Sequence, residues 1–148
     1  MEIRLITAEQ AKAATDQELF DRISSDYLSY EEWQPSDSWI YIGFFDGDIL
    51  GYVMLHPENE STMYIHINVL KEHRGRGYEI AKRGLKAINE SLLDRYRKFI
   101  CKIPVVYPSV YHFAKTVGFL DEGLCTKSIM KGGVLVDQYM LGLERNKT

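Results

Sequence analysis

Cysteine, proline and long apolar segments are all scarce in this chain of 148 residues. Its 2 cysteines, Cys101 and Cys125, cannot build a disulfide framework, so we expect two buried thiols in a reduced, cytoplasmic protein. No apolar run is long enough to cross a bilayer, and the first residues do not resemble a signal peptide. Cysteine and histidine do not cluster with the spacing of a zinc site, which argues against a metal centre.

Basic residues are outnumbered overall, and the formal net charge is -3. Residues 1–62 hold 13 acidic and 3 basic side chains, whereas residues 71–102 hold 10 basic and 4 acidic ones. A solvated helix face accounts for much of the basic segment, but the segment also predicts a positive potential that attracts a ligand with several phosphates. Nucleic acid is the weaker alternative, because the total charge is acidic and no aromatic-basic reading motif is present.

The apolar residues predict an alternation of strands and helices along the whole chain. With 45% hydrophobic residues, residues 1–148 suffice for one compact domain with a sizeable core. Strands are expected at 2–7, 39–45, 49–55, 62–70, 98–103, 124–130 and 134–143. Helices are expected at 8–23, 26–33, 78–95 and 109–117. This order predicts an α/β protein built on one mixed sheet.

A basic, glycine-bearing turn joins the strand at 62–70 to the helix at 78–95, and its residues 72–79 read Glu-His-Arg-Gly-Arg-Gly-Tyr-Glu. The first amides of a helix have no intrahelical acceptor, and the helix dipole adds positive charge there. We expect Gly75 and Gly77 to adopt backbone angles closed to other residues and to let a phosphate come close. Arg74 and Arg76 add charges that pair with phosphate oxygens. The turn therefore predicts an anion site.

This turn resembles the pyrophosphate-binding signature of the GCN5-related N-acetyltransferase (GNAT) superfamily. The signature is Arg or Gln, two residues, Gly, one residue, then Gly or Ala; Arg74 and Gly77 match it, and Glu79 stands at the last position. The order of elements is also that of the GNAT fold over nearly the whole chain. The end of the helix at 109–117 is similar to that of phage-encoded members.

The resemblance implies a single-domain GNAT-like fold, with a mixed, mostly antiparallel sheet of about seven strands and about four helices. It also implies acetyl-coenzyme A (acetyl-CoA) as co-substrate, entering where two parallel strands part. The pantetheine arm would bond the main chain of Ile67 and Val69. The pyrophosphate would be held by the turn, through Arg74, Gly75, Arg76, Gly77, Tyr78 and Glu79.

Acetyl transfer in the family is a direct attack of an amine on the thioester, which requires a base for the amine and an acid for the departing thiolate. The usual tyrosine acid falls on Ala114 here, so Tyr107 and Tyr111 are the candidate substitutes. His66 is the candidate base, because an imidazole is neutral near pH 7; an interior, hydrogen-bonded histidine is the alternative.

The acceptor remains open between a small-molecule amine and a protein amine, and a homodimer is compatible with the sequence. The aromatic residues at 27–41 belong either to the core or to a wall of the acceptor site. The rival function is a catalytically degenerate GNAT-fold protein that acts through a protein interface, such as a phage or bacterial assembly factor. Ala114 and Glu79 favour this rival.

Overall fold

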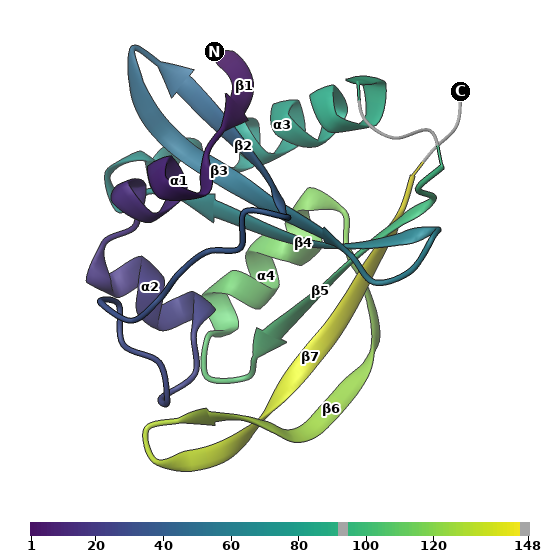
Figure 1. Cartoon of the computed structure of the whole chain (residues 1–148). Coiled ribbons are helices and arrows are strands. Elements are labelled where there is room, and N and C mark those ends of the chain that lie inside the picture. The colour runs from purple at the N-terminus through teal and green to yellow at the C-terminus, as the bar shows by residue number, and fades with distance from the viewer. Residues whose placement is uncertain (92–94, 146–148) are drawn as a thin grey trace.

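The computed structural model describes residues 1–91 and 95–145 and contains one seven-stranded sheet with helices on both faces (Figure 1). The strands are β1 (Glu2–Ile6), β2 (Ile40–Asp46), β3 (Asp48–Pro57), β4 (Thr62–Val69), β5 (Lys98–Pro104), β6 (Leu120–Lys131) and β7 (Val134–Glu144). The helices are α1 (Ala8–Ala14), α2 (Gln17–Ile23), α3 (Gly77–Ser91) and α4 (Pro108–Val117), with a 3-10 helix, η1 (Lys71–Arg76), before α3.

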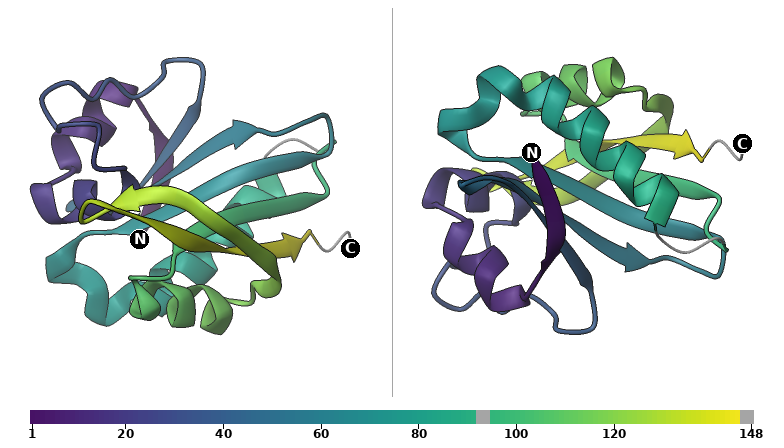
Figure 2. Two further views of the ribbon diagram at one scale, coloured as in Figure 1. Left: turned by 90° about the horizontal axis from the view of Figure 1, so that it is seen from below. Right: turned by 90° about the horizontal axis from the view of Figure 1, so that it is seen from above.

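The strand order is β1-β2-β3-β4-β5-β7-β6, and all neighbours are antiparallel except β4 and β5. The predicted fold class, a mixed and mostly antiparallel sheet of seven strands with four α-helices, is therefore confirmed. In both views of Figure 2, α3 and α4 lie on one face of the sheet and α1 and α2 on the other.

Each face of the sheet has its own hydrophobic core. The larger core joins the sheet to α3 and α4 and includes Phe44, Ile65 and Ile80, which are fully or almost fully buried. The smaller core joins α1 and α2 to β2 and β3, where the hydroxyl of the buried Tyr52 lies 2.6 Å from Thr15 Oγ1. Both cores form because alternate residues of a strand point to opposite faces.

Two predictions about the helices are wrong, and a third extends beyond the described residues. The segment 8–23 contains two helices: Thr15 is the C-cap of the first, and Asp16 caps the second by accepting a hydrogen bond from the Leu19 amide. The segment 26–33 contains turns and no helix. The described part of α3 ends at Ser91, and residues 92–94 of the predicted helix 78–95 lie outside the described residues.

No described helix combines the length and the hydropathy that crossing a membrane requires. The residues described also contain no group of three or more metal-binding side chains.

Candidate functional site

The two parallel strands at the centre of the sheet separate soon after they meet. β4 and β5 pair only from Thr62 with Lys98 to Tyr64 with Ile100, whereas β4 remains paired with β3 up to Val69. The later half of β4 therefore has a sheet neighbour on one side and an opening on the other. The predicted parting of two parallel strands is present in the structure.

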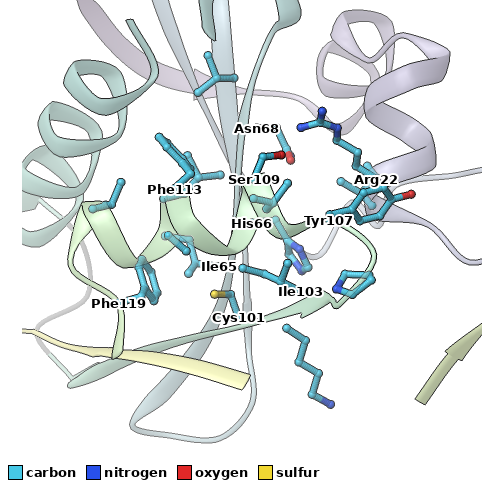
Figure 3. Close-up of a pocket in the computed structure, with 18 of the residues that line it drawn as sticks. Arg22, Ile65, His66, Asn68, Cys101, Ile103, Tyr107, Ser109, Phe113 and Phe119 are labelled. Atoms are coloured by element: carbon cyan, nitrogen blue, oxygen red, sulfur yellow. The ribbon is translucent and has the colours of Figure 1, made fainter. Parts of the chain in front are cut away.

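A pocket of about 530 Å³ occupies this opening, a size typical of small-molecule sites. β4 supplies Ile65, His66, Ile67, Asn68 and Val69 to its wall, and further wall residues come from α2, β3, β5, α4 and the start of α3. In Figure 3, the apolar side chains of Phe113 and Phe119 lie on one side of the pocket. Arg22 and Tyr107 lie on the other, with His66 closer to them.

One end of the pocket, here called the α3 end, is formed by Arg74 and Gly77. Neither Gly75 nor Gly77 has a positive φ, so the prediction of unusual backbone angles is wrong. Gly77 has right-handed helical angles, and its amide donates a hydrogen bond to the Arg74 carbonyl. A Cβ at Gly77 would lie 3.3 Å from the Phe113 ring, whereas a Cβ at Gly75 would face open space. The glycine at 77 thus permits close packing of α3 against α4.

The two arginines of the turn point in different directions. Arg74 lines the pocket, where its Nη1 donates to Glu18 Oε1 at 2.8 Å and its Nε donates to the Val69 carbonyl at 3.4 Å. Arg76 lies outside the pocket wall and donates to Asp46 Oδ2 at 2.7 Å and to the Glu79 carboxylate at 3.4 Å. These bonds lower the pKa of both the Asp46 and the Glu79 carboxyl groups. Of the two, only Arg74 faces the pocket.

The side chains of Tyr78 and Glu79 also point elsewhere. Glu79 forms ion pairs with Arg76 and Arg83, both on the outer surface, and does not line the pocket. Tyr78 is 52% exposed. The carboxylate at the last position of the signature therefore leaves the ligand space free.

The opposite end of the pocket, here called the aromatic end, is formed by His56, Tyr64, His66 and Lys102. The His56 ring stacks on Tyr64 at a centroid distance of 4.9 Å and on His66 at 5.7 Å. Behind it, the Trp39 ring stacks on His56 at 4.1 Å. Burial and, secondarily, the nearby His56 lower the pKa of His66 to about 4, so the imidazole is neutral at pH 7.

The structure separates the two candidate tyrosines. Tyr107 lines the pocket, and its hydroxyl donates to the Asp21 carbonyl at 2.9 Å. The hydroxyl of Tyr111 lies 2.7 Å from both carboxylate oxygens of Asp121, which raises the Tyr111 pKa, and Tyr111 does not line the pocket. Ala114 does line it, at the place where the resemblance implies a tyrosine.

Sequence reasoning missed several groups in the pocket wall. Asn68 is 5% exposed, and its Nδ2 has no hydrogen-bond partner among the described residues. Cys101 lines the pocket, where burial raises the pKa of its thiol to about 12. A polar residue inside the apolar run of β4 was the one signal that could have marked Asn68. No sequence pattern marked Lys102, because nothing in the neighbouring residues distinguishes it from other lysines on strands.

The aromatic residues at 27–41 divide between the two interpretations that the sequence left open. Tyr30 and Trp33 pack around Phe20, and Tyr41 is buried, whereas Tyr27 is 80% exposed. Only Trp39 reaches the pocket region, through its stack on His56.

Comparison with known proteins agrees with this architecture. The sequence matches the model of the Acetyltransferase (GNAT) family over residues 6–119. No curated protein sequence matches the chain.

Two solved structures illustrate the likeness in fold. The spermidine N-acetyltransferase from Vibrio cholerae, in complex with CoA and spermine, has a TM-score of 0.74 and 15% identity over 97% of this chain and 95% of its own. The GNAT-family acetyltransferase from Streptococcus pneumoniae has a TM-score of 0.67 and 17% identity over 98% of this chain and 99% of its own. The family match covers most of the chain and confirms the resemblance found in the sequence: the protein belongs to the GNAT family of acetyltransferases.

Proposed function

We propose that the protein is an acetyl-CoA-dependent N-acetyltransferase that transfers the acetyl group directly to a primary amine. One observation carries this proposal: a single pocket extends from the start of α3, through the opening between β4 and β5, to a titratable group, His66. The α3 end offers a cation for a phosphate, and the aromatic end offers a neutral base for an amine. Both belong to one cavity, as a bisubstrate reaction requires.

The residues at the α3 end fit the phosphate part of acetyl-CoA. Arg74 would pair with the pyrophosphate, and the absence of a side chain at Gly77 leaves the start of α3 accessible. The main chain of Ile67 and Val69, beside the opening of the sheet, would bond the pantetheine arm. Acetyl-CoA supplies the activated acyl group, and the protein supplies position, solvent exclusion and proton transfer.

The amine must reach the thioester as a neutral nucleophile. Its nitrogen forms the new bond to the acetyl carbon, the carbon–sulfur bond breaks, the nitrogen gives up one proton and the sulfur takes up one. His66 is neutral at pH 7 and accepts a proton most readily once the new bond has made the nitrogen acidic. A weakly basic imidazole therefore suits the later part of the step better than deprotonation of a free ammonium group.

The proton for the sulfur would come from the polar wall of the pocket. Tyr107 is the candidate that lies there, and its hydroxyl would have to leave the Asp21 carbonyl to serve. Asn68, whose Nδ2 lies near Tyr52 but makes no hydrogen bond of normal geometry among the described residues, would donate a hydrogen bond to a substrate oxygen in the same space.

Calorimetry with coenzyme A tests the proposal, and the two neighbouring arginines provide a matched pair. Arg74→Ala should weaken binding roughly tenfold to a hundredfold, the range for loss of a charge-assisted hydrogen bond. Arg76→Ala removes the same charge two residues further along the chain but outside the pocket, and should change the affinity less than about threefold.

Two results would contradict the proposal. If the wild-type protein binds no coenzyme A at millimolar concentration, the pocket is not a cofactor site and a role through a protein interface is favoured. If both substitutions weaken binding equally, the phosphate site is not where Arg74 lies.

A further inference from the structure

The charge of the pocket wall is the feature that bears on the acceptor. Among the described residues that line the pocket, none is aspartate or glutamate, whereas Arg22, Arg74 and Lys102 are cationic. A substrate with several ammonium groups needs carboxylates to replace its lost hydration. The cationic wall of this pocket would repel such a substrate.

Two of these three cations already have a carboxylate partner. Glu18 Oε1 lies 2.8 Å from Arg74 Nη1 and 3.0 Å from Arg22 Nε. Lys102 differs, because no described carboxylate lies within ion-pair distance of its ammonium group. The Lys102 ammonium group lies over the face of the Tyr64 ring, and its Nζ is 5.7 Å from the ring centroid. Of these three cations, Lys102 is therefore the one whose charge is not already balanced by a described carboxylate.

The register of the sheet places Lys102 beside the candidate base. Tyr64 pairs with Ile100, so Lys102, two residues further along β5, lies on the same face as Tyr64 and His66. The strands diverge beyond that pair, which leaves room between Lys102 and His66 for a small molecule. An amine at His66 could thus carry a second group that reaches Lys102.

The rings around this space are uncharged at neutral pH. Burial lowers the pKa of both His56 and His66, and Tyr64 and Trp39 complete the stack. The charge of Glu58 partly opposes the lowering of the His56 pKa, but the Glu58 side chain is exposed and does not line the pocket. Lys102 therefore acts on a ligand against an apolar and aromatic background, where a charge is poorly screened.

From this arrangement we infer that the acceptor is a primary amine that also carries an anionic group, a carboxylate or a phosphate, and that Lys102 binds this group. The inference rests on the proposed acetyltransferase function. The inferred acceptor differs in charge from spermine, the polycation with which the structural neighbour from Vibrio cholerae was solved.

Matched acceptor pairs test the inference. Acetylation rates are measured for O-phosphoethanolamine against ethanolamine and for tyrosine against tyramine, with spermidine as the polyamine probe. The anionic member of at least one pair should be preferred, and spermidine should be the poorest acceptor. Lys102→Met should reduce the ratio of kcat/KM values within the preferred pair about tenfold, mainly through KM, since it removes one charge-assisted bond. Lys102→Arg should retain the ratio.

Lys86→Met is the control, because Lys86 is an exposed lysine on α3 that does not line the pocket; its ratio should stay within about twofold. Thermal unfolding of each variant establishes that it is folded. The inference is overturned if spermidine or the uncharged partners are preferred, if Lys102→Met leaves the ratio unchanged, or if neither anionic probe is acetylated or bound by the complex with coenzyme A. Failure of the wild type to bind coenzyme A at all would instead refute the proposed function.

Discussion

The two ends of the pocket are assembled differently. The α3 end comes from one short segment, in which Arg74 and Gly77 are three residues apart. The aromatic end is drawn from three strands: His56 on β3, Tyr64 and His66 on β4, and Lys102 on β5. The first end therefore depends on local backbone geometry, and the second depends on the register of the sheet. Disturbing the sheet should damage the aromatic end, whereas the turn should tolerate small changes.

Two glycines provide the strongest test of this contrast. A Cβ at Gly51, on β3, would lie 2.4 Å from the backbone oxygen of Asn68, which cannot move without separating β3 from β4. Gly51→Ala should lower the free energy of unfolding by about 3 kcal/mol. Gly75→Ala meets open space in a right-handed helical turn and should raise it by up to about 1 kcal/mol. Urea unfolding measures both, and equal effects would contradict the contrast.

The pH dependence of stability tests the environment of His66. Its pKa of about 4 in the folded protein lies below the value of about 6.5 in an unfolded chain, so the unfolded state binds the proton first as the pH falls. Stability should therefore decrease between pH 6.5 and pH 4, and by about 2 kcal/mol at pH 5.

His66→Gln removes the contribution of His66 to this pH dependence. The free energy of unfolding should therefore fall less between pH 7 and pH 5 in this variant than in the wild type, by about 2 kcal/mol. His112→Gln is the control, because His112 is exposed on α4 and outside the pocket wall. Denaturant titrations at the two pH values provide the comparison. An identical pH dependence in the wild type and His66→Gln would show that His66 is solvated in the folded protein.

A smaller effect on the free energy of unfolding is expected from Tyr52, a buried residue outside the pocket wall. Tyr52 is fully buried on β3, and burial raises its pKa to about 12, an effect that the hydrogen bond with Thr15 reduces. Tyr52→Phe loses that bond, while the Thr15 hydroxyl still donates to the Ala11 carbonyl. The free energy of unfolding should fall by about 1 kcal/mol, with coenzyme A affinity unchanged. A large loss of coenzyme A affinity in this variant would mean that the two ends are not independent.

The smallest effect concerns Glu18, the carboxylate that neutralises Arg74. One of its oxygens is buried without a hydrogen-bond partner among the described residues, so the pairing is imperfect. Glu18→Gln should release Arg74 for a phosphate and strengthen coenzyme A binding by about threefold, the scale of a partly exposed ion pair. Glu9→Gln, an exposed change on α1, should have no effect, and calorimetry distinguishes them. Weaker binding in Glu18→Gln would show that Glu18 positions Arg74 rather than competing for it.

The same contrast explains what could be read from the sequence. The order of strands and helices along the chain, the basic turn and Arg74 are local patterns, and each could be recognised from consecutive residues. The role of Gly77 could not, because it depends on Phe113 of α4, 36 residues further along the chain. In the sequence, Arg76 is equivalent to Arg74; only the structure shows that Arg76 donates hydrogen bonds to Asp46 and Glu79. Tyr111 was chosen because it lies within two helical turns of Ala114, but the direction of its side chain depends on Asp121.

The aromatic end illustrates the larger difficulty. A lysine on a strand and two histidines on neighbouring strands carry no motif, and they meet only through the register of β3 on β4 and of β4 on β5. Asn68 and Cys101 gain their chemical interest from burial beside a cavity, which no local pattern reports. Sequence reasoning therefore identified Arg74 and Gly77 at the α3 end of the pocket and left most of the aromatic end undetermined.

A crystal structure of the protein with coenzyme A is the most direct test of the central claim. The account predicts the pyrophosphate against Arg74 and the start of α3, with the pantetheine arm in the opening between β4 and β5 and the sulfur on the side of His66. It would be contradicted by a crystal grown in saturating coenzyme A in which Arg74 still pairs with Glu18 and the ligand lies outside that opening.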